Sequence, residues 1–250
     1  MTDTPTVSLA AIVTILVLIG GRAAIAQERV DLPTRPGVTQ PVYVTAVQAP
    51  KASVILFPGG SGVVAQVRNN FLLRVASRFV AQGMTVAVVD TPSDHPNGMG
   101  AQARATTDHV TDIAAVVAML KNRSSTPVWL IGTSRGSISA ANGAANIGPP
   151  RIAGVVLSSS VWEGGVASIA LDQIKVPILV VHNHDDGCRE SPFSDTEAMM
   201  GRMRQATVKE LVAVSGGTSR SGPCDALSPH GYYGIEDQVV PPIIAWIKAH

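Results

Sequence analysis

The residues most suited to chemistry in this chain are two serines that stand in the same tetrapeptide. Gly-Thr-Ser-Arg occurs around Ser134 and again around Ser219. The first copy is completed by Gly136, which gives G-x-S-x-G, the pattern of a nucleophile elbow on a tight strand-to-helix turn. The second copy has Ser221 at that position and is followed by turn-forming residues. We therefore predict that Ser134 is a nucleophile with an exposed hydroxyl and that Ser219 lies in a loop.

The segments around Ser134 predict a layered α/β scaffold. An alternating stretch at 37–47 is typical of an early strand, and continuous apolar runs are typical of strands buried on both faces. These runs are 52–57, 84–90, 127–131, 152–160, 176–182 and 207–217. Helical patterns separate them at 66–82, 101–123 and 137–146, and Ser194 with Glu197 has capping-box spacing ahead of another helix. This order predicts a mostly parallel, doubly wound sheet flanked by helices, in one domain over 27–250.

The elbow and the order of elements resemble the α/β-hydrolase family over residues 40–250. In that family the nucleophile is followed by an acid after a later strand, often within H-G-x-x-D, and then by a histidine. Here the corresponding stretch is HNHDD, residues 182–186, with asparagine in place of the glycine. The resemblance makes Asp186 the acid, and it leaves Asp185 and Glu163 as alternatives.

The same resemblance implies a base and an oxyanion hole. His230, after the last predicted strand, takes the position of the base that removes the proton from Ser134. One oxyanion donor is then the backbone N–H of Arg135. The other comes from the FPGGSG loop, where Gly60 and Ser61 are both candidates.

The resemblance further implies an uncapped, serine esterase-like enzyme. The stretch between the runs 152–160 and 176–182 is too short for a helical cap domain. We expect an open site with Trp162 and the loop 90–98 as walls, and we expect His109 on a helix surface. The implied activity is that of a carboxylic-ester hydrolase acting on a small-molecule ester or thioester through an acyl-enzyme, with no cofactor and no metal.

Composition and the N-terminal segment bear on location and partners. The formal net charge of +1 in 250 residues offers no basic face for nucleic acid. Residues 1–26 contain an apolar run followed by a small-x-small sequence, which predicts a signal peptide cleaved before Gln27. The alternative is an uncleaved anchor, although the run is shorter than a bilayer span. With cleavage, the protein is exported, to the periplasm or the medium, and has no stable membrane span.

The two cysteines fit an exported protein. Cys188 and Cys224 are the only cysteines, and in an oxidising compartment they are an obvious disulfide pair. Cys188 follows Asp186 by two residues, and Cys224 precedes His230 by six. A bond between them would tie the predicted acid loop to the predicted histidine loop and preorganise both.

Two other classes of function compete with a serine hydrolase. His182, His184 and Asp186 resemble the start of the H-x-H-x-D-H motif of zinc hydrolases, although Gly187 replaces the last histidine. A non-catalytic binding protein on a hydrolase scaffold is the other, since fold does not imply function. An acyltransferase would share the serine chemistry.

Overall fold

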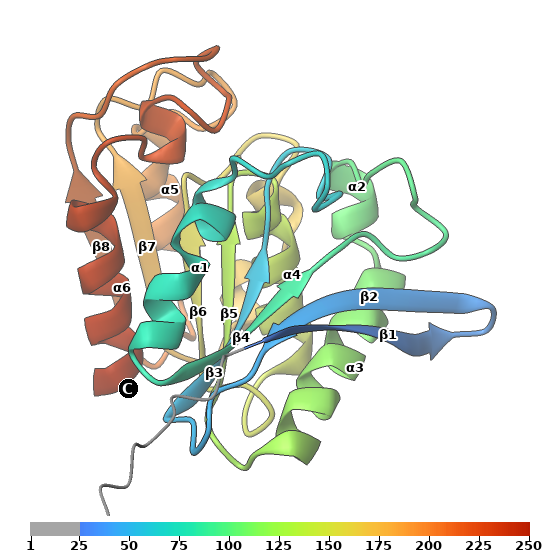
Figure 1. The fold of residues 1–250 in the computed structure, drawn as a ribbon. Coiled ribbons are helices and arrows are strands. Elements are labelled where there is room, and N and C mark those ends of the chain that lie inside the picture. The colour runs from blue at the N-terminus through green and yellow to red at the C-terminus, as the bar shows by residue number, and fades with distance from the viewer. Residues whose placement is uncertain (1–25) are drawn as a thin grey trace, which may run out of the picture.

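In the computed structural model, which describes residues 26–250, the chain forms one eight-stranded sheet (Figure 1). The strands are β1 (Gln27–Arg35), β2 (Val38–Thr45), β3 (Ala52–Phe57), β4 (Met84–Val89), β5 (Val128–Thr133), β6 (Gly154–Ser158), β7 (Ile178–Asn183) and β8 (Lys209–Val214). They lie in the order β1-β2-β4-β3-β5-β6-β7-β8. Strands β3 to β8 are parallel, and β1 and β2 are antiparallel additions at one edge. The predicted fold class is confirmed.

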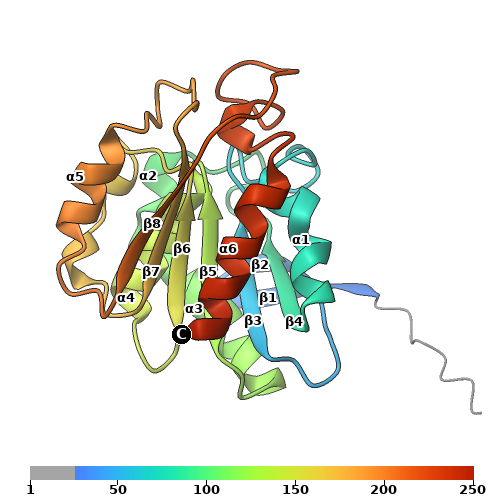
Figure 2. The same cartoon turned by 90° about the vertical axis from the view of Figure 1, so that its left-hand side faces the viewer.

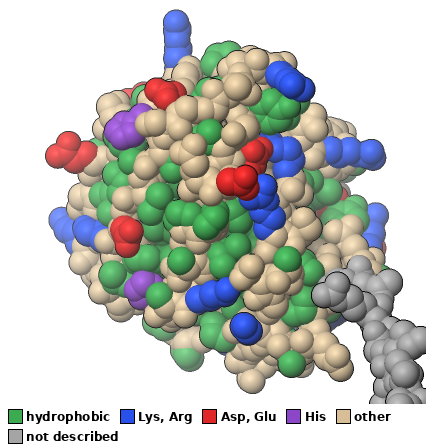
Figure 3. All heavy atoms as spheres, turned by 60° about the vertical axis from the view of Figure 1, so that its left-hand side comes forward, with side chains coloured by type: hydrophobic (Ala, Val, Ile, Leu, Met, Phe, Trp, Pro, Cys, Tyr) green, Lys and Arg blue, Asp and Glu red, His purple; other side chains and the backbone are tan. Residues whose placement is uncertain are grey.

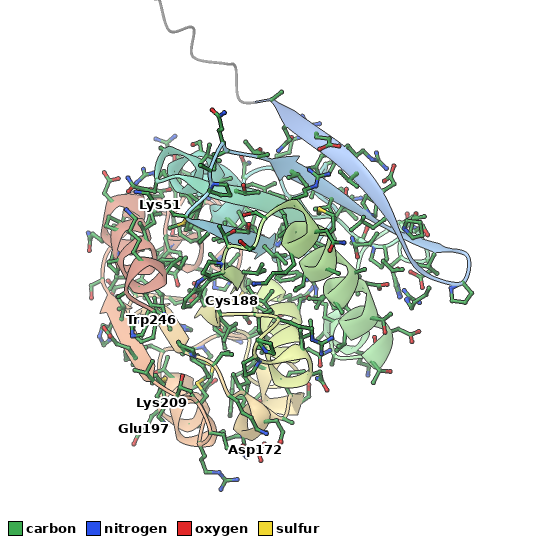
Figure 4. All side chains as sticks on the ribbon, turned by 90° about the horizontal axis from the view of Figure 1, so that it is seen from below. Lys51, Asp172, Cys188, Glu197, Lys209 and Trp246 are labelled. Atoms are coloured by element: carbon green, nitrogen blue, oxygen red, sulfur yellow. A yellow bond between two sulfur atoms is a disulfide. The ribbon has the colours of Figure 1, made fainter. Side chains whose placement is uncertain are left out.

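Helices cover both faces of the sheet. They are α1 (Phe71–Ala81), α2 (Ala101–Arg104), α3 (Thr107–Arg123), α4 (Gly136–Ile147), α5 (Asp195–Arg202) and α6 (Glu236–Ala249), with short 3-10 turns η1 (Val166–Ser168), η2 (Leu171–Gln173) and η3 (Pro229–Gly231). One core lies under α1 and α6, which pack side by side (Figure 2). The other lies under α3, α4 and α5. Seen from below, α6 and α3 stand on opposite sides of the sheet (Figure 4). Only η1 and η2 fill the connection from β6 to β7, so no cap domain is inserted there.

Two helices differ from the sequence prediction at positions that matter for the site. Helix α1 starts at Phe71 and not at residue 66, because the Asn70 side chain accepts a hydrogen bond from the Leu72 amide and caps the helix there. The predicted helix over 101–123 is split into α2 and α3. Thr106 caps α3 by accepting from the His109 amide. Residues 66–70 and 105–106 of the predicted helices are therefore not helical, and residues 66–70 form part of a cavity wall.

The N-terminal edge contains a strand that the sequence pattern did not predict. β1 includes Pro33 and is largely exposed, as proline is tolerated only on an edge strand. Arg35 at its end donates to the buried carboxylate of Asp112 on α3 at 2.9 Å. At α5, Ser194 forms no side-chain cap, so the predicted capping box is absent.

The predicted signal peptide lies outside the described residues except for Ala26. Within residues 26–250 there is no helix whose length and hydrophobicity would let it cross a bilayer. On the face shown in Figure 3, charged side chains of both signs are scattered among apolar ones and form no basic patch. This agrees with the charge balance of the sequence.

Candidate active site

Ser134 stands on a strained turn between β5 and α4, at the carboxyl edge of the sheet. Its φ is 53°, in the left-handed region that side chains rarely adopt. A Cβ on Gly132 would collide with the backbone of Gly136, and a Cβ on Gly136 would collide with the carbonyl of Phe57. Both glycines of the motif are therefore required by packing, as the elbow pattern predicts.

The three predicted side chains lie in one hydrogen-bonded chain. The distance from Ser134 Oγ to His230 Nε2 is 2.9 Å, and the distance from His230 Nδ1 to Asp186 Oδ2 is 2.8 Å. The side chains of His230 and Asp186 are 4% and 0% exposed, so solvent does not compete for this contact. In this arrangement the imidazole can accept the serine proton while the carboxylate fixes the tautomer.

Asp186 is ionised in its buried position. Burial by itself acts to raise its pKa, but the nearby His182 ring and the hydrogen bonds from His230 and the Cys188 amide outweigh burial and hold the pKa below the ordinary carboxyl value. The two alternative acids lie elsewhere. Asp185 Oδ2 accepts from the Gly216 amide, and Glu163 is exposed after β6.

Further side chains hold this acid and base, in roles that were not predicted from the sequence. Ser191 Oγ donates to Asp186 Oδ2 at 3.0 Å and lies 3.0 Å from His230 Nδ1. His182 Nε2 donates to the Ser191 carbonyl at 2.8 Å and lies 3.5 Å from Asp186 Oδ2. Asn183, the residue in place of the family's glycine, donates to the Pro229 carbonyl beside His230 at 3.0 Å. No short sequence motif links these residues, so their contacts become visible only in the folded chain.

The predicted disulfide is present between Cys188 and Cys224. Cys188 is buried and its amide donates to Asp186 Oδ1 at 2.9 Å, so the bridge reaches the carboxylate through one backbone contact. Cys188 is labelled in Figure 4. Cys224 lies at the other end of the bridge and lines the cavity in front of Ser134. The bridge therefore connects the loop after β7 to the loop that carries His230.

A cavity of about 450 Å³ opens in front of Ser134. Its walls are the loop after β3, the segment before α1 and the loop before η3, with lining residues Gly59, Gly60, Ala65, Gln66, Val67, Arg68, Asn69, Asn70, Phe71, Thr133, Ser134, Cys224, Asp225, Ala226, His230 and Gly231. Gly60 lines this cavity, whereas Ser61 does not and its hydroxyl donates to Gln66. Among residues 26–250, the Gly60 and Arg135 amides donate to no protein acceptor.

The predicted walls of the site were wrong. Trp162 does not line the cavity, because its indole packs under the guanidinium of Arg202 at 5.7 Å, on the α5 side of the sheet. The loop 90–98 is also absent from the lining and packs instead against the loop after β3, where the Gly98 position abuts Ser61.

Comparisons with known proteins agree with this geometry. Residues 48–172, half of the chain, match the model of the family described as serine aminopeptidase, S33, a family of α/β hydrolases. This chain is an α/β hydrolase. The matched region includes Ser134 and ends before Asp186 and His230. Among curated proteins, none matches the hydrolase in sequence.

Solved structures resemble the hydrolase in fold. One is a cold-adapted esterase from an Arctic intertidal metagenomic library, with 16% identity, a TM-score of 0.63, and coverage of 89% of this chain and 92% of that chain. Another is an esterase of Pyrococcus furiosus, with 14% identity, a TM-score of 0.67 and 90% coverage of both chains. A dienelactone hydrolase from Anabaena variabilis has 15% identity, a TM-score of 0.64, and coverage of 90% and 98%.

The second serine of the repeated tetrapeptide lies in a loop of the hydrolase, as predicted. Ser219 is exposed and follows Gly217, whose φ is 100°. Arg220 stacks over the ring of Tyr233 at 5.4 Å. Neither Ser219 nor Arg220 lines the cavity in front of Ser134.

The metal alternative finds no support in the geometry. His184 is exposed and stacks on Phe193 with ring centroids 3.7 Å apart, while His182 is buried against Ser191. Within the described part of the hydrolase, no group of three or more His, Cys, Asp or Glu side chains is placed to hold a metal ion.

His109 is buried, and the prediction that it lies on the surface was wrong. Its Nε2 lies 2.9 Å from Ser139 Oγ of α4. Arg104, which the sequence analysis did not consider, is buried beside it and shares Ser139 as a partner. A helical pattern with His109 on its polar side gave no signal that this polar group packs under the loop after β3.

Proposed function

We propose that this hydrolase is a serine carboxylic-ester hydrolase that works through an acyl-enzyme on Ser134. The observation that supports this most is the continuous hydrogen-bonded chain from Ser134 Oγ through His230 to Asp186. The cavity in front of the hydroxyl gives a substrate access to it. The esterase folds found among its structural neighbours point the same way.

In the acylation step, Ser134 Oγ attacks the carbonyl carbon of an ester, and its proton passes to His230 Nε2. Asp186 stabilises the imidazolium that forms. The carbonyl oxygen becomes an oxyanion, which is stabilised by the amides of Gly60 and Arg135, neither of which donates to an acceptor within residues 26–250. The carbon–oxygen bond to the alcohol then breaks, and His230 returns the proton to the departing alcohol.

In the deacylation step, a water molecule takes the place of the alcohol. His230 accepts one proton from the water as its oxygen attacks the acyl carbon, and the same amides hold the second oxyanion. Collapse of this intermediate breaks the bond to Ser134 Oγ, which recovers its proton from His230. The products are an acid and an alcohol, and no cofactor takes part in either step.

The substrate we propose is a small ester or thioester. The cavity holds about 450 Å³ and opens to solvent without a cap domain. Its walls carry amide and charged side chains of Gln66, Asn69 and Asp225. Such walls suit a compact, polar substrate better than a long acyl chain, which needs a continuous apolar groove.

We also propose that the enzyme is exported. The apolar run within residues 1–26 and the Cys188–Cys224 disulfide support this together, because disulfides persist mainly in oxidising compartments. Cell fractionation with N-terminal sequencing tests it. A mature N-terminus at Gln27 outside the cytoplasm is expected, and an intact N-terminus in the cytosol would contradict the proposal.

A panel of esters and thioesters of graded acyl length, with aminoacyl amides included, tests the activity. The proteins compared are the parent, Ser134→Ala and the matched variant Ser219→Ala. We expect short esters to be turned over by the parent and Ser219→Ala, with kcat lowered at least about 10³-fold in Ser134→Ala. Activity that survives in Ser134→Ala and is lost in Ser219→Ala would overturn the assignment. Binding of esters without turnover by the parent would favour the binding-protein alternative.

A further inference from the structure

A buried arginine without a carboxylate partner lies under the loop after β3. Arg104 ends α2 and is 3% exposed. Within residues 26–250 it forms no ion pair, and its side chain contacts only neutral acceptors. A charge in the interior without a partner of opposite sign lowers the stability of the fold. Its presence therefore calls for a role that a neutral side chain cannot fill.

The guanidinium connects the loop after β3 to the helix after Ser134. Arg104 Nη2 donates to the Pro58 carbonyl at 3.2 Å, immediately before the glycine pair that faces the nucleophile. Arg104 Nη1 donates to Ser139 Oγ of α4 at 3.0 Å. The Pro58 carbonyl also lies against Gly136, the first residue of α4. The planar guanidinium of Arg104 thus fixes the distance between the loop after β3 and helix α4.

The same guanidinium also holds the far end of the loop. Arg104 Nε donates to the Met99 carbonyl at 3.3 Å, and the Met99 amide donates to the Ser61 carbonyl at 2.8 Å. Between these two anchors, the Gly62 amide donates to the Gly59 carbonyl and closes a turn. Gly60 lies in that turn with φ 62° and lines the cavity. The direction of the Gly60 amide is therefore set by a loop that Arg104 contacts directly at Pro58 and, through Met99, at Ser61.

The charge on this group is present at neutral pH. Burial, and to a smaller extent Arg135, lowers the pKa of Arg104 to about 10, which leaves it protonated. Burial and the nearby Arg104 charge lower the pKa of His109 to about 3, so that ring is neutral. Asp90 also lines the pocket under the loop, but its carboxylate accepts from the Val64 and Thr91 amides and forms no ion pair with Arg104.

We propose that Arg104 is a positioning residue of the oxyanion hole. It holds the Pro58–Ser61 loop so that the Gly60 amide points at the substrate oxygen, and its uncompensated positive charge favours the negative charge that develops there. Its effect is confined to the transition state, because the ground-state carbonyl carries no full charge. This inference rests on the proposed serine mechanism.

The test compares Arg104→Met with a matched variant, Arg202→Met. Arg202 also donates to two backbone carbonyls, of Ala167 and Ile169, but lies away from the cavity. On the best ester, we expect Arg104→Met to lower kcat roughly ten- to hundredfold with KM changed less than about twofold. The rate of inactivation by a fluorophosphonate, whose adduct mimics the oxyanion intermediate, should fall in parallel. Arg202→Met should lose thermal stability and keep both rates.

Parent-like kcat in folded Arg104→Met would overturn the proposal, as would a loss of kcat matched by an equal loss in Arg202→Met. If Arg104→Met does not fold, Arg104→Lys and Arg104→Gln are compared. Lysine keeps the charge and glutamine does not, so kcat should be higher in Arg104→Lys, and equal values would contradict the proposal. A parent enzyme that neither turns over esters nor reacts with the phosphonate would overturn the serine mechanism itself. An active parent with unaffected Arg104 variants would overturn this inference alone.

Discussion

On one side of Ser134, the loops after β7 and β8 hold His230 with an ionised carboxylate and a disulfide. On the other side, the loops after β3 and β5 present backbone amides. The buried guanidinium of Arg104 donates to the Pro58 carbonyl in the loop after β3. The first side is supported by an anion and the second by a cation. In the proposed mechanism, His230 becomes positive and the substrate oxygen becomes negative at the same moment. Each buried charge is thus opposite in sign to the charge that develops beside it.

The two sides also differ in how they are anchored to the chain. Asp186 is held by side chains from its own loop, such as Ser191, and by a covalent bridge across to the histidine loop. The loop containing Gly60 has no disulfide. Arg104 holds it by one direct hydrogen bond to the Pro58 carbonyl, and through Met99, whose amide donates to the Ser61 carbonyl. We infer that removing a single group should affect orientation of the base on the first side and geometry of the oxyanion hole on the second.

The largest expected effect comes from Asp186→Asn. An amide at this position supports the wrong imidazole tautomer and cannot stabilise the imidazolium, so kcat should fall roughly 10³- to 10⁴-fold. The matched variant is Asp185→Asn, because the Asp185 carboxylate accepts from the Gly216 amide and does not contact His230. Steady-state kinetics on one ester measures both. A larger loss in Asp185→Asn would move the acid to the alternative residue.

Breaking the disulfide should lower stability and activity together. Its half-cystines are 36 residues apart, for which loop closure contributes about 4 kcal/mol to stability. The double variant Cys188→Ala, Cys224→Ala is compared with the reduced parent by thermal melts and ester kinetics. We expect a lower melting midpoint and a lower kcat in both, because the bridge holds in place the segment whose Cys188 amide donates to Asp186. An unchanged midpoint and kcat after verified reduction would show that the disulfide contributes to neither stability nor activity.

The pH dependence of stability should carry the signature of Asp186. Its folded pKa is depressed, so the stability it contributes is present above the unfolded carboxyl pKa of about 3.9 and is lost as the pH falls further. The melting midpoint of the parent should therefore drop more steeply than that of Asp186→Asn in the acid range. Melts of both proteins across this range measure the difference. Parallel curves would show that the carboxylate does not gain stability from its partners.

A smaller effect is expected from Ser191→Ala. Its hydroxyl gives Asp186 one hydrogen bond, worth about 1–2 kcal/mol, so kcat should fall about fivefold to thirtyfold. Ser194→Ala is the matched control, since Ser194 makes no side-chain cap. The pH profile of kcat should shift in Ser191→Ala and stay fixed in the control. An unchanged profile and rate would leave Ser191 a packing residue only.

Local patterns predicted the parts of this molecule that depend on local sequence. Buried runs marked β3 to β8, and the spacing of Gly132 and Gly136 marked the elbow, because a tight turn needs glycines at fixed positions. Family register placed Asp186 and His230, which the fold brings to the same edge of the sheet. The sequence signal for each of these features lies within a few residues of the strand, turn or side chain that it predicts.

What the sequence did not predict depends on contacts between distant segments. Ser191 and Arg104 act through partners on other loops, so neither has a motif. Trp162 and His109 were misplaced because their surroundings are set by α5 and by the loop after β3. The start of helix α1 is an exception, because the Asn70 cap that fixes it is a local signal, whereas the apolar periodicity alone predicts an earlier start.

The most direct test of the account is to find which serine reacts. The parent, Ser134→Ala and Ser219→Ala are each treated with a fluorophosphonate, and the labelled peptide is identified by mass spectrometry. Both serines stand in the same tetrapeptide, so sequence context within those four residues cannot favour one over the other. We expect one label on Ser134 in the parent and in Ser219→Ala, and none in Ser134→Ala. A label on Ser219, or an unlabelled parent that still hydrolyses esters, would contradict it.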